Sequence, residues 1–200
     1  MLKNSATAQG RVITDPPLAR FLFSDVRMSW LWLVLRVWLG YQWLNSGLGK
    51  ATNPAWVQTG DALKGYWTNA VAIPAEGRPA IAFDWYRSFL TFLLNSESYT
   101  WFAKLIVAGE VLVGVALIVG AFVGIAAFFG AAMNWNFIMA GSASTNGLLL
   151  LIAILLILAW KTAGYIGLDY FLLRCLGVPW STRKEVEAPL PPIKLAPALE

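Results

Sequence analysis

Four long apolar segments dominate the pattern of hydrophobic and polar positions along the chain. They cover approximately residues 29–48, 102–121, 123–141 and 147–167. A helix of roughly 20 mostly apolar residues is long enough to cross the hydrocarbon core of a bilayer. Between Lys104 and Lys161 the only charged side chain is that of Glu110. The pattern therefore predicts an all-α protein, an integral membrane four-helix bundle.

Short connections join the last three of these segments. The second and third meet around Phe122, where Gly120 and Gly124 give the backbone freedom to turn. The third and fourth are separated only by the sequence SASTN. Short connections make consecutive helices antiparallel neighbours. We predict a four-helix domain over residues 29–173, preceded by an N-terminal cytoplasmic tail (1–28) and followed by a flexible C-terminal tail (174–200).

The connection between the first two segments, residues 50–101, is too long for a plain linker. It is rich in Trp and Tyr, which collect at the membrane–water boundary. Asp84–Leu94 is predicted to form an interfacial helix, and Pro54–Leu63 another. The whole segment is interpreted either as a cap on the bundle or as a lid over a site that opens outward.

Composition narrows the chemistry of the chain. It is 58% hydrophobic and only 13% charged, which is typical of membrane proteins. There is no histidine, and Cys175 is the single cysteine. We therefore predict no metal site and no cofactor bound covalently or through metal ligands, so any redox centre is borrowed from another molecule.

Basic residues are dispersed rather than clustered, which indicates no nucleic-acid partner. With four crossings both termini lie on one side. That side carries Arg11, Arg20, Arg27, Lys161, Arg174, Arg183 and Lys184, whereas Lys50, Lys64, Arg78 and Arg87 belong to the long loop. The positive-inside rule places both termini in the cytoplasm and the loop outside it. The predicted location is the bacterial cytoplasmic (inner) membrane, in contact with membrane lipid.

Arg36 and Glu110 are charged residues inside the first and second predicted spans. A charge near mid-span costs roughly 2.5–3.5 kcal/mol on insertion scales, so such residues usually face the bundle interior and pair. The two spans are antiparallel, so Arg36 is expected to approach Glu110, with Asp169 as a rival partner. Three interpretations stay open: an ion pair that fixes helix register, a proton or quinone-headgroup site, or a protonated Glu110.

A second polar group lies toward the predicted outer side and includes Asn45, Asn134, Asn136 and Asn146. Asn134 and Asn136 are two residues apart, so a regular helix points them to nearly opposite faces. Such amides commonly join membrane helices by hydrogen bonds. The alternative is that they bind a small oxyanion, and the four asparagines are the candidate substrate-binding residues.

Four motifs in order resemble those of the DoxX/DoxD family. They are RVWLGYQWLNSGLGK at 36–50, EVLVGVALIVG at 110–120, NWNFIMAGSASTN at 134–146 and AGYIGLD at 163–169. The resemblance covers about residues 29–173, and the long aromatic insertion is similar to the larger, DoxD-like branch. It implies four transmembrane helices.

Some members of that family are the membrane subunit of thiosulfate:quinone oxidoreductase, which oxidises thiosulfate to tetrathionate and passes electrons to quinone. The resemblance thus implies a redox-complex subunit with quinone and a sulfur oxyanion as ligands and with other membrane-complex subunits as partners. Arg36 and Glu110 are then the candidate catalytic residues. The alternative is a non-catalytic accessory or assembly subunit of a respiratory or photosynthetic membrane complex, which the missing histidine favours.

Overall fold

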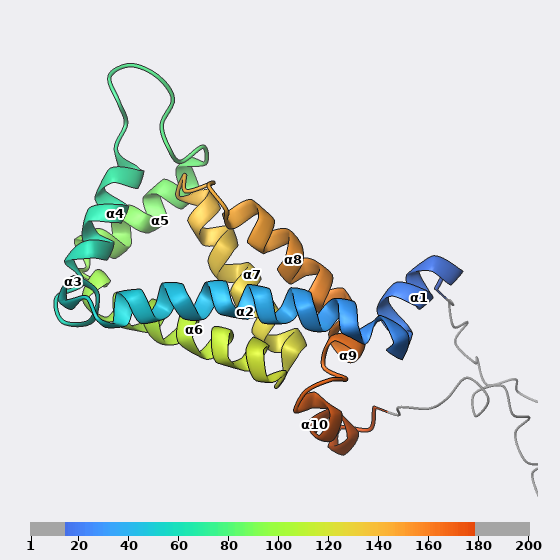
Figure 1. The fold of residues 1–200 in the computed structure, drawn as a ribbon. Coiled ribbons are helices and arrows are strands. Elements are labelled where there is room, and N and C mark those ends of the chain that lie inside the picture. Colours follow the sequence, from blue (N-terminus) through green and yellow to red (C-terminus); the bar gives the residue numbers. More distant parts are fainter. Residues whose placement is uncertain (1–14, 179–200) are drawn as a thin grey trace, which may run out of the picture.

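The computed structural model describes residues 15–178, and this part of the chain is helical without strands. Its elements are α1 (Pro17–Ser24), the 3₁₀ turn η1 (Val26–Met28), α2 (Ser29–Ala51), α3 (Pro54–Val57), α4 (Asp61–Val71), α5 (Asp84–Asn95), α6 (Tyr99–Val119), α7 (Val123–Met139), α8 (Asn146–Leu158), α9 (Trp160–Ala163) and α10 (Asp169–Cys175). Figure 1 shows their arrangement, with the 72–83 loop projecting away from the helices. The predicted all-α class is confirmed.

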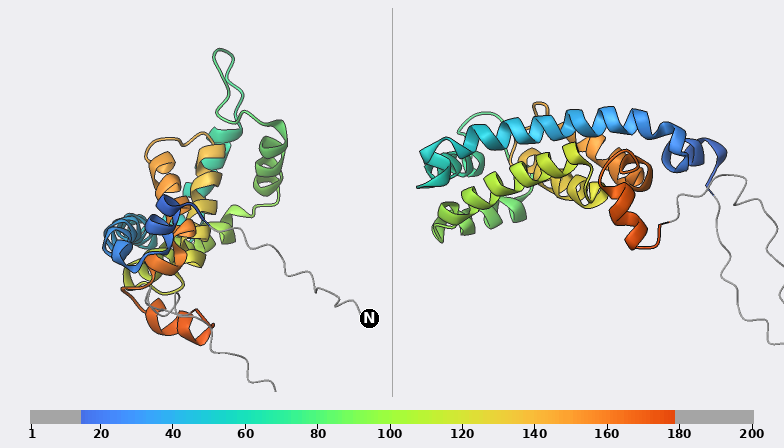
Figure 2. Two further views of the ribbon diagram at one scale, coloured as in Figure 1. Left: turned by 90° about the vertical axis from the view of Figure 1, so that its right-hand side faces the viewer. Right: turned by 60° about the horizontal axis from the view of Figure 1, so that its bottom comes forward.

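The longest helices, α2 and α6, form an antiparallel pair that runs the length of the bundle (Figures 1 and 2). Glycine makes their contact unusually close. A Cβ atom added to Gly114 of α6 would lie 2.6 Å from the backbone nitrogen of Leu44. One added to Gly47 of α2 would lie 2.9 Å from the nitrogen of Val111. The two backbones therefore touch directly, which fixes the register of one helix against the other.

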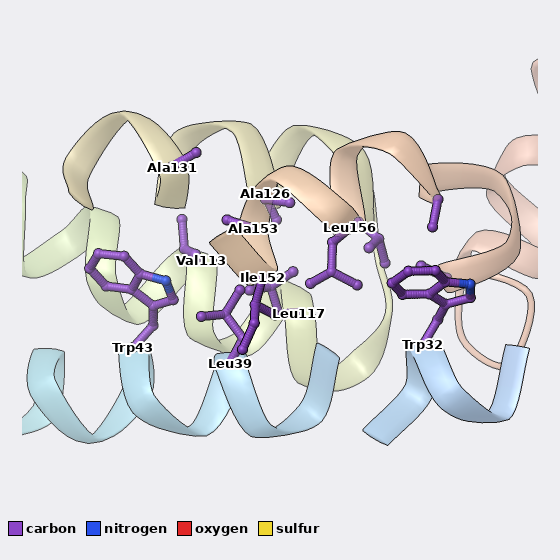
Figure 3. Packing of buried hydrophobic residues seen from close by; sticks show 14 residues of the cluster. Trp32, Leu39, Trp43, Val113, Leu117, Ala126, Ala131, Ile152, Ala153 and Leu156 are labelled. Atoms are coloured by element: carbon purple, nitrogen blue, oxygen red, sulfur yellow. The ribbon is translucent and has the colours of Figure 1, made fainter. Parts of the chain in front are cut away.

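Helices α7 and α8 pack against each other and close the main hydrophobic core over α2. Figure 3 shows this core, with Trp32 and Trp43 of α2 at its two ends. Small residues of α7 fill the space between the helices, among them Ala127, which is fully buried. Small residues recur four positions apart in this helix, as Ala126 and Gly130 and as Ala127 and Ala131, and all four are buried in contacts within the chain.

The connection after α2 folds into a helical cap with a core of its own. Leu63 and Trp67 of α4 pack with Tyr86 and Leu90 of α5 and with the start of α6. The predicted helix at Asp84–Leu94 is confirmed as α5. The segment predicted as one helix over Pro54–Leu63 instead divides into α3 and α4.

The helices differ in detail from two of the predicted segments. The fourth apolar segment leaves the α-helix at Leu158, because the chain turns there to pack residues 159–169 under the ends of the other helices. The predicted N-terminal tail is helical in α1, and the Thr162 hydroxyl donates a hydrogen bond to the carbonyl of Phe23 at 3.0 Å. Predictions for residues 1–14 and 179–200 lie outside the described residues.

Within residues 15–178, one helix is both long and apolar enough to cross a membrane. It is α6, with a mean hydropathy of 2.3 over its most apolar window. Helices α7 and α8 are apolar but have 17 and 13 residues, so they measure about 26 and 20 Å at ~1.5 Å per residue. The predicted bundle of four membrane-spanning helices is therefore not confirmed.

Candidate functional site

The most buried ion pair in the described chain joins the C-terminal end of α2 to the middle of α6. Lys50 Nζ lies 2.8 and 2.7 Å from Oε1 and Oε2 of Glu110, and it donates to Ser46 Oγ at 2.6 Å. The Glu110 side chain is 1% exposed and that of Lys50 is 21% exposed. Ser46 and Lys50 are one turn apart on α2, so the Lys50 ammonium reaches both the Ser46 hydroxyl and the Glu110 carboxylate.

The expected pair between Arg36 and Glu110 is wrong. The close contact of α2 with α6 places Arg36 opposite Leu117, two turns beyond Glu110, and brings Lys50 opposite Glu110 instead. Sequence reasoning treated Lys50 as a loop charge, because the apolar run ends before it. The available signal was its place at the end of the first motif, one helical turn after Ser46.

Arg36 takes part in a second buried polar cluster at the other end of the bundle. Its guanidinium donates to the carbonyls of Leu117 (3.1 Å) and Ile166 (2.6 Å). Leu117 belongs to the last turn of α6, where the helix dipole favours a cation. A side chain at Gly120 would collide with this guanidinium, so only glycine fits there.

Asp169 completes this cluster from the opposite side of the joint between α6 and α7. Its carboxylate oxygens accept from the backbone N–H groups of Phe122 (2.6 Å) and Val123 (2.8 Å), at the N-terminus of α7. Burial raises the pKa of the Asp169 carboxyl, and those two N–H groups and the Arg36 charge oppose the rise. We call Arg36 and Asp169, with the backbone groups they bind, the joint cluster.

A polar pocket of about 490 Å³ opens above the Lys50–Glu110 pair. Its polar lining comes from α2, from Glu110 of α6 and from the turn between α7 and α8, and it includes Gln42, Asn45, Ser46, Lys50, Glu110, Ser142, Thr145 and Asn146. Two of the four candidate asparagines, Asn45 and Asn146, therefore meet at this pocket. Arg36 lies at the opposite end of α2.

The other two asparagines lie elsewhere, as the helical spacing predicts. Asn134 is fully buried, and neither of its amide atoms has a hydrogen-bond partner among the described residues. Asn136 accepts a hydrogen bond from the Tyr86 hydroxyl at Oδ1 (3.1 Å) and donates to the carbonyl of Ala132 (2.8 Å). Asn136 thus ties the cap to α7.

Aromatic side chains that sequence reasoning did not assign to a site complete the polar pocket. Trp43 lines it and is 3% exposed, and its indole N–H is buried without an acceptor in the described chain. The Trp56 ring lies 5.3 Å from Lys50 Nζ, in cation–π contact. The Trp43 N–H lies against Gly130 of α7, where an added Cβ atom would be 3.1 Å from the indole nitrogen, so the pocket has aromatic walls beside the ion pair.

A second cavity, of about 470 Å³, lies between the cap and helices α6 and α7. Tyr66 and Phe137 line both cavities, and the Tyr66 hydroxyl donates to the Phe137 carbonyl at 3.3 Å. These two side chains therefore form the wall between the polar pocket and the apolar cavity. Burial raises the pKa of Tyr66, and it raises that of Tyr86, on the cavity lining, to about 12.

The polar pocket can bind and position a small polar molecule. The Lys50 ammonium donates hydrogen bonds, the Glu110 carboxylate accepts them and can take up a proton, and the amides and hydroxyls around them do both. In residues 15–178 no three side chains of His, Cys, Asp or Glu gather as metal ligands would. No protein-family model matches the chain, and neither a curated protein nor a solved structure does.

Proposed function

We propose that this chain is a DoxX/DoxD-like membrane subunit of a redox complex, in which thiosulfate oxidation is coupled to quinone reduction. The observation that carries the proposal is the position of Glu110. It is buried on the lining of a polar pocket and held by Lys50, which also donates to Ser46. A buried charge pair inside apolar helices is expensive, and such residues typically mark a ligand or proton path.

Residues of the first two motifs meet at this pocket. Ser46 and Lys50 end the first motif, and Glu110 begins the second. Gly47 and Gly114, also from these motifs, make the helix contact that brings the charges together. The arrangement supports a shared purpose for residues that lie far apart in the sequence.

Exposed apolar surface supports a membrane location. Large apolar side chains point outward from the bundle helices, for example Val34 (66% exposed), Leu112 (68%) and Phe128 (58%). Soluble monomers rarely expose contiguous apolar surface on this scale. In this proposal α2, α6, α7 and α8 all cross the bilayer, α8 is continued by α9, and both termini face the cytoplasm.

The proposed reaction removes two electrons from two thiosulfate ions, which join through a new S–S bond as tetrathionate. Quinone takes up these two electrons and two protons and becomes quinol. The thiosulfate would bind in the polar pocket, where an anion competes with Glu110 for Lys50. Thiosulfate oxidation releases no proton, so both protons of the quinol come from solvent, and Glu110, released from Lys50, would pass them on. A partner subunit supplies the electron path.

The test is thiosulfate-dependent reduction of decylubiquinone by the purified native complex. Glu110→Gln should abolish turnover while the complex still assembles. Glu76→Gln, which changes an exposed carboxylate of the 72–83 loop, is the matched control and should retain it. Absence of activity with every quinone and partner combination would refute the redox proposal. Loss of assembly in Glu110→Gln would instead assign the pair a role in helix register.

A second candidate function is that of a non-catalytic accessory subunit. The observation that favours it is the adjacent pair Phe128 and Phe129 on α7, which are 58% and 57% exposed. Such a pair suits contact with a partner helix. Purification of the native complex, followed by identification of the proteins that accompany this chain, separates a respiratory or photosynthetic assembly from a thiosulfate-oxidising one.

A further inference from the structure

The apolar cavity has a lining that selects for hydrocarbon. Its walls include Leu63 and Leu90 of the cap, Phe102 and Ile106 of α6, and Met133 of α7. No charged side chain lines it. At about 470 Å³ it has the size of a site for a small organic molecule or part of a larger one.

The hydroxyl groups on the lining already donate within the protein. The Tyr86 hydroxyl donates to Asn136, and the Asn136 amide donates to the Ala132 carbonyl. The Tyr66 hydroxyl donates to the Phe137 carbonyl. Neither hydroxyl is therefore free to bind the carbonyl oxygens of a ligand headgroup such as a quinone ring. A saturated or monounsaturated chain needs no such donor.

The mouth of the cavity is apolar too. Four lining residues from α5, α6 and α7 are also surface residues: Phe89, Leu105, Leu112 and Phe129 are between 45% and 68% exposed. A ligand that enters between them comes from a hydrocarbon phase. Lys104, next to Leu105 on α6, is exposed and forms no ion pair with any residue in the described range. It offers a cation for a phosphate at the membrane surface.

We propose that this cavity holds one acyl chain of a membrane phospholipid, whose phosphate lies at Lys104. The inference rests on the membrane placement in the proposed function and is independent of the redox chemistry. The acyl chain fills the space between the cap and the bundle, so the bound lipid contacts α4 and α5 on one side and α6 and α7 on the other. The acyl chain approaches the polar pocket as far as the wall formed by Tyr66 and Phe137.

Gly109 provides a way to fill the cavity without disturbing the fold. It lies on the cavity wall in α6, and an added Cβ atom would meet only the flexible Met133 side chain, at 3.4 Å from its sulfur. Leucine is also a better helix former than glycine, so Gly109→Leu is expected to fold. Gly65→Leu is the matched control, because Gly65 of α4 is exposed with no atom within 4 Å of the added Cβ.

The experiment uses the full chain, purified in detergent and depleted of lipid. It is titrated with 1-palmitoyl-2-oleoyl-phosphatidylglycerol, and separately with decylubiquinone, and bound molecules are counted by native mass spectrometry. Wild type and Gly65→Leu should each bind one phospholipid molecule. Gly109→Leu should bind it at least about tenfold more weakly, and Lys104→Ala about fivefold more weakly.

Three results would overturn the inference. They are unchanged phospholipid binding in Gly109→Leu, unchanged binding in Lys104→Ala, and decylubiquinone binding that is sensitive to Gly109→Leu where phospholipid binding is not. Lys104 is exposed, so its variant gives a decision even where Gly109→Leu does not fold. Failure of the thiosulfate assay leaves this measurement unaffected, so the two proposals fail separately.

Discussion

Removal of the Asp169 carboxylate is the sharpest test of how the bundle is held together. Asp169→Ala deletes the acceptor of two short hydrogen bonds, from the N–H groups of Phe122 and Val123 at the start of α7. It also removes the negative charge that attracts the buried guanidinium of Arg36. The joint between α6 and α7 would keep its cation and lose its anion.

The expected cost follows from those contacts. A hydrogen bond to a charged group contributes roughly 1.5–3 kcal/mol. Two such bonds are lost, and a buried charge that loses its counter-charge costs about 3–5 kcal/mol. Because these effects overlap at one carboxylate, we expect Asp169→Ala to lower the free energy of unfolding by about 3–5 kcal/mol. Asp169→Asn keeps one acceptor oxygen and should cost roughly half as much.

The assay is denaturant unfolding in detergent micelles, followed by circular dichroism. Asp84→Ala is the matched control. Its carboxylate is 93% exposed and pairs with Arg87 across one helical turn at 2.6 Å, so its loss should cost about 0.2–1 kcal/mol. A cost for Asp169→Ala within 1 kcal/mol of that for Asp84→Ala would refute the argument that the joint cluster stabilises the fold.

Three further predictions concern the ion pair, the helix contact and the cap. Lys50→Met leaves a buried carboxylate without its cation and should lower the free energy of unfolding by about 3–5 kcal/mol. Glu110→Gln leaves an ammonium that reaches solvent and should lower it by about 1–2 kcal/mol. A double-mutant cycle measures both changes, and the reverse order would contradict the buried geometry. Gly114→Val forces α2 from α6 and should cost about 1–3 kcal/mol in the same unfolding assay, in contrast to Gly65→Val on open surface. With its pKa raised to about 12, Tyr86 stabilises the fold below pH ~10 and loses that contribution as pH rises through its folded-state pKa. When the native protein is titrated with base and followed by phenolate absorbance, the tyrosine that ionises at the highest pH should therefore be missing in Tyr86→Phe. An unchanged titration curve would contradict the burial of Tyr86.

The hydrophobic pattern was sufficient to locate the helices, since apolar runs and their interruptions are local properties. The predicted segment at 29–48 corresponds to Ser29–Ala51, and that at 102–121 to Tyr99–Val119. The partner of Glu110 could not be found in this way. Arg36 and Lys50 are both basic residues of α2, and only the register of α2 against α6 decides between them. Glycine contacts set that register, and their depth depends on the packed structure.

The residues of the polar pocket could likewise be predicted only in part from the sequence. Four asparagines look equivalent as letters in a sequence, but helical geometry separates Asn134 from Asn136. The turn between α7 and α8 then brings Asn146 to the end of α2, beside Asn45. The tryptophans of the pocket were indistinguishable from the many others, because the unpaired indole N–H of Trp43 is a property of its surroundings.

The backbone contact between α2 and α6 has a consequence for motion. Sliding of one helix along the other would replace the close contacts of Gly40, Gly47 and Gly114 by contacts with larger side chains. Shear between these helices is therefore blocked, and they behave as one rigid beam. Two walls of the polar pocket belong to that beam, and the others come from the 142–146 turn, from α7 and α8 on either side of it, and from the cap. Movement that admits a ligand is therefore expected in these other walls, while the charge pair keeps its place on the beam.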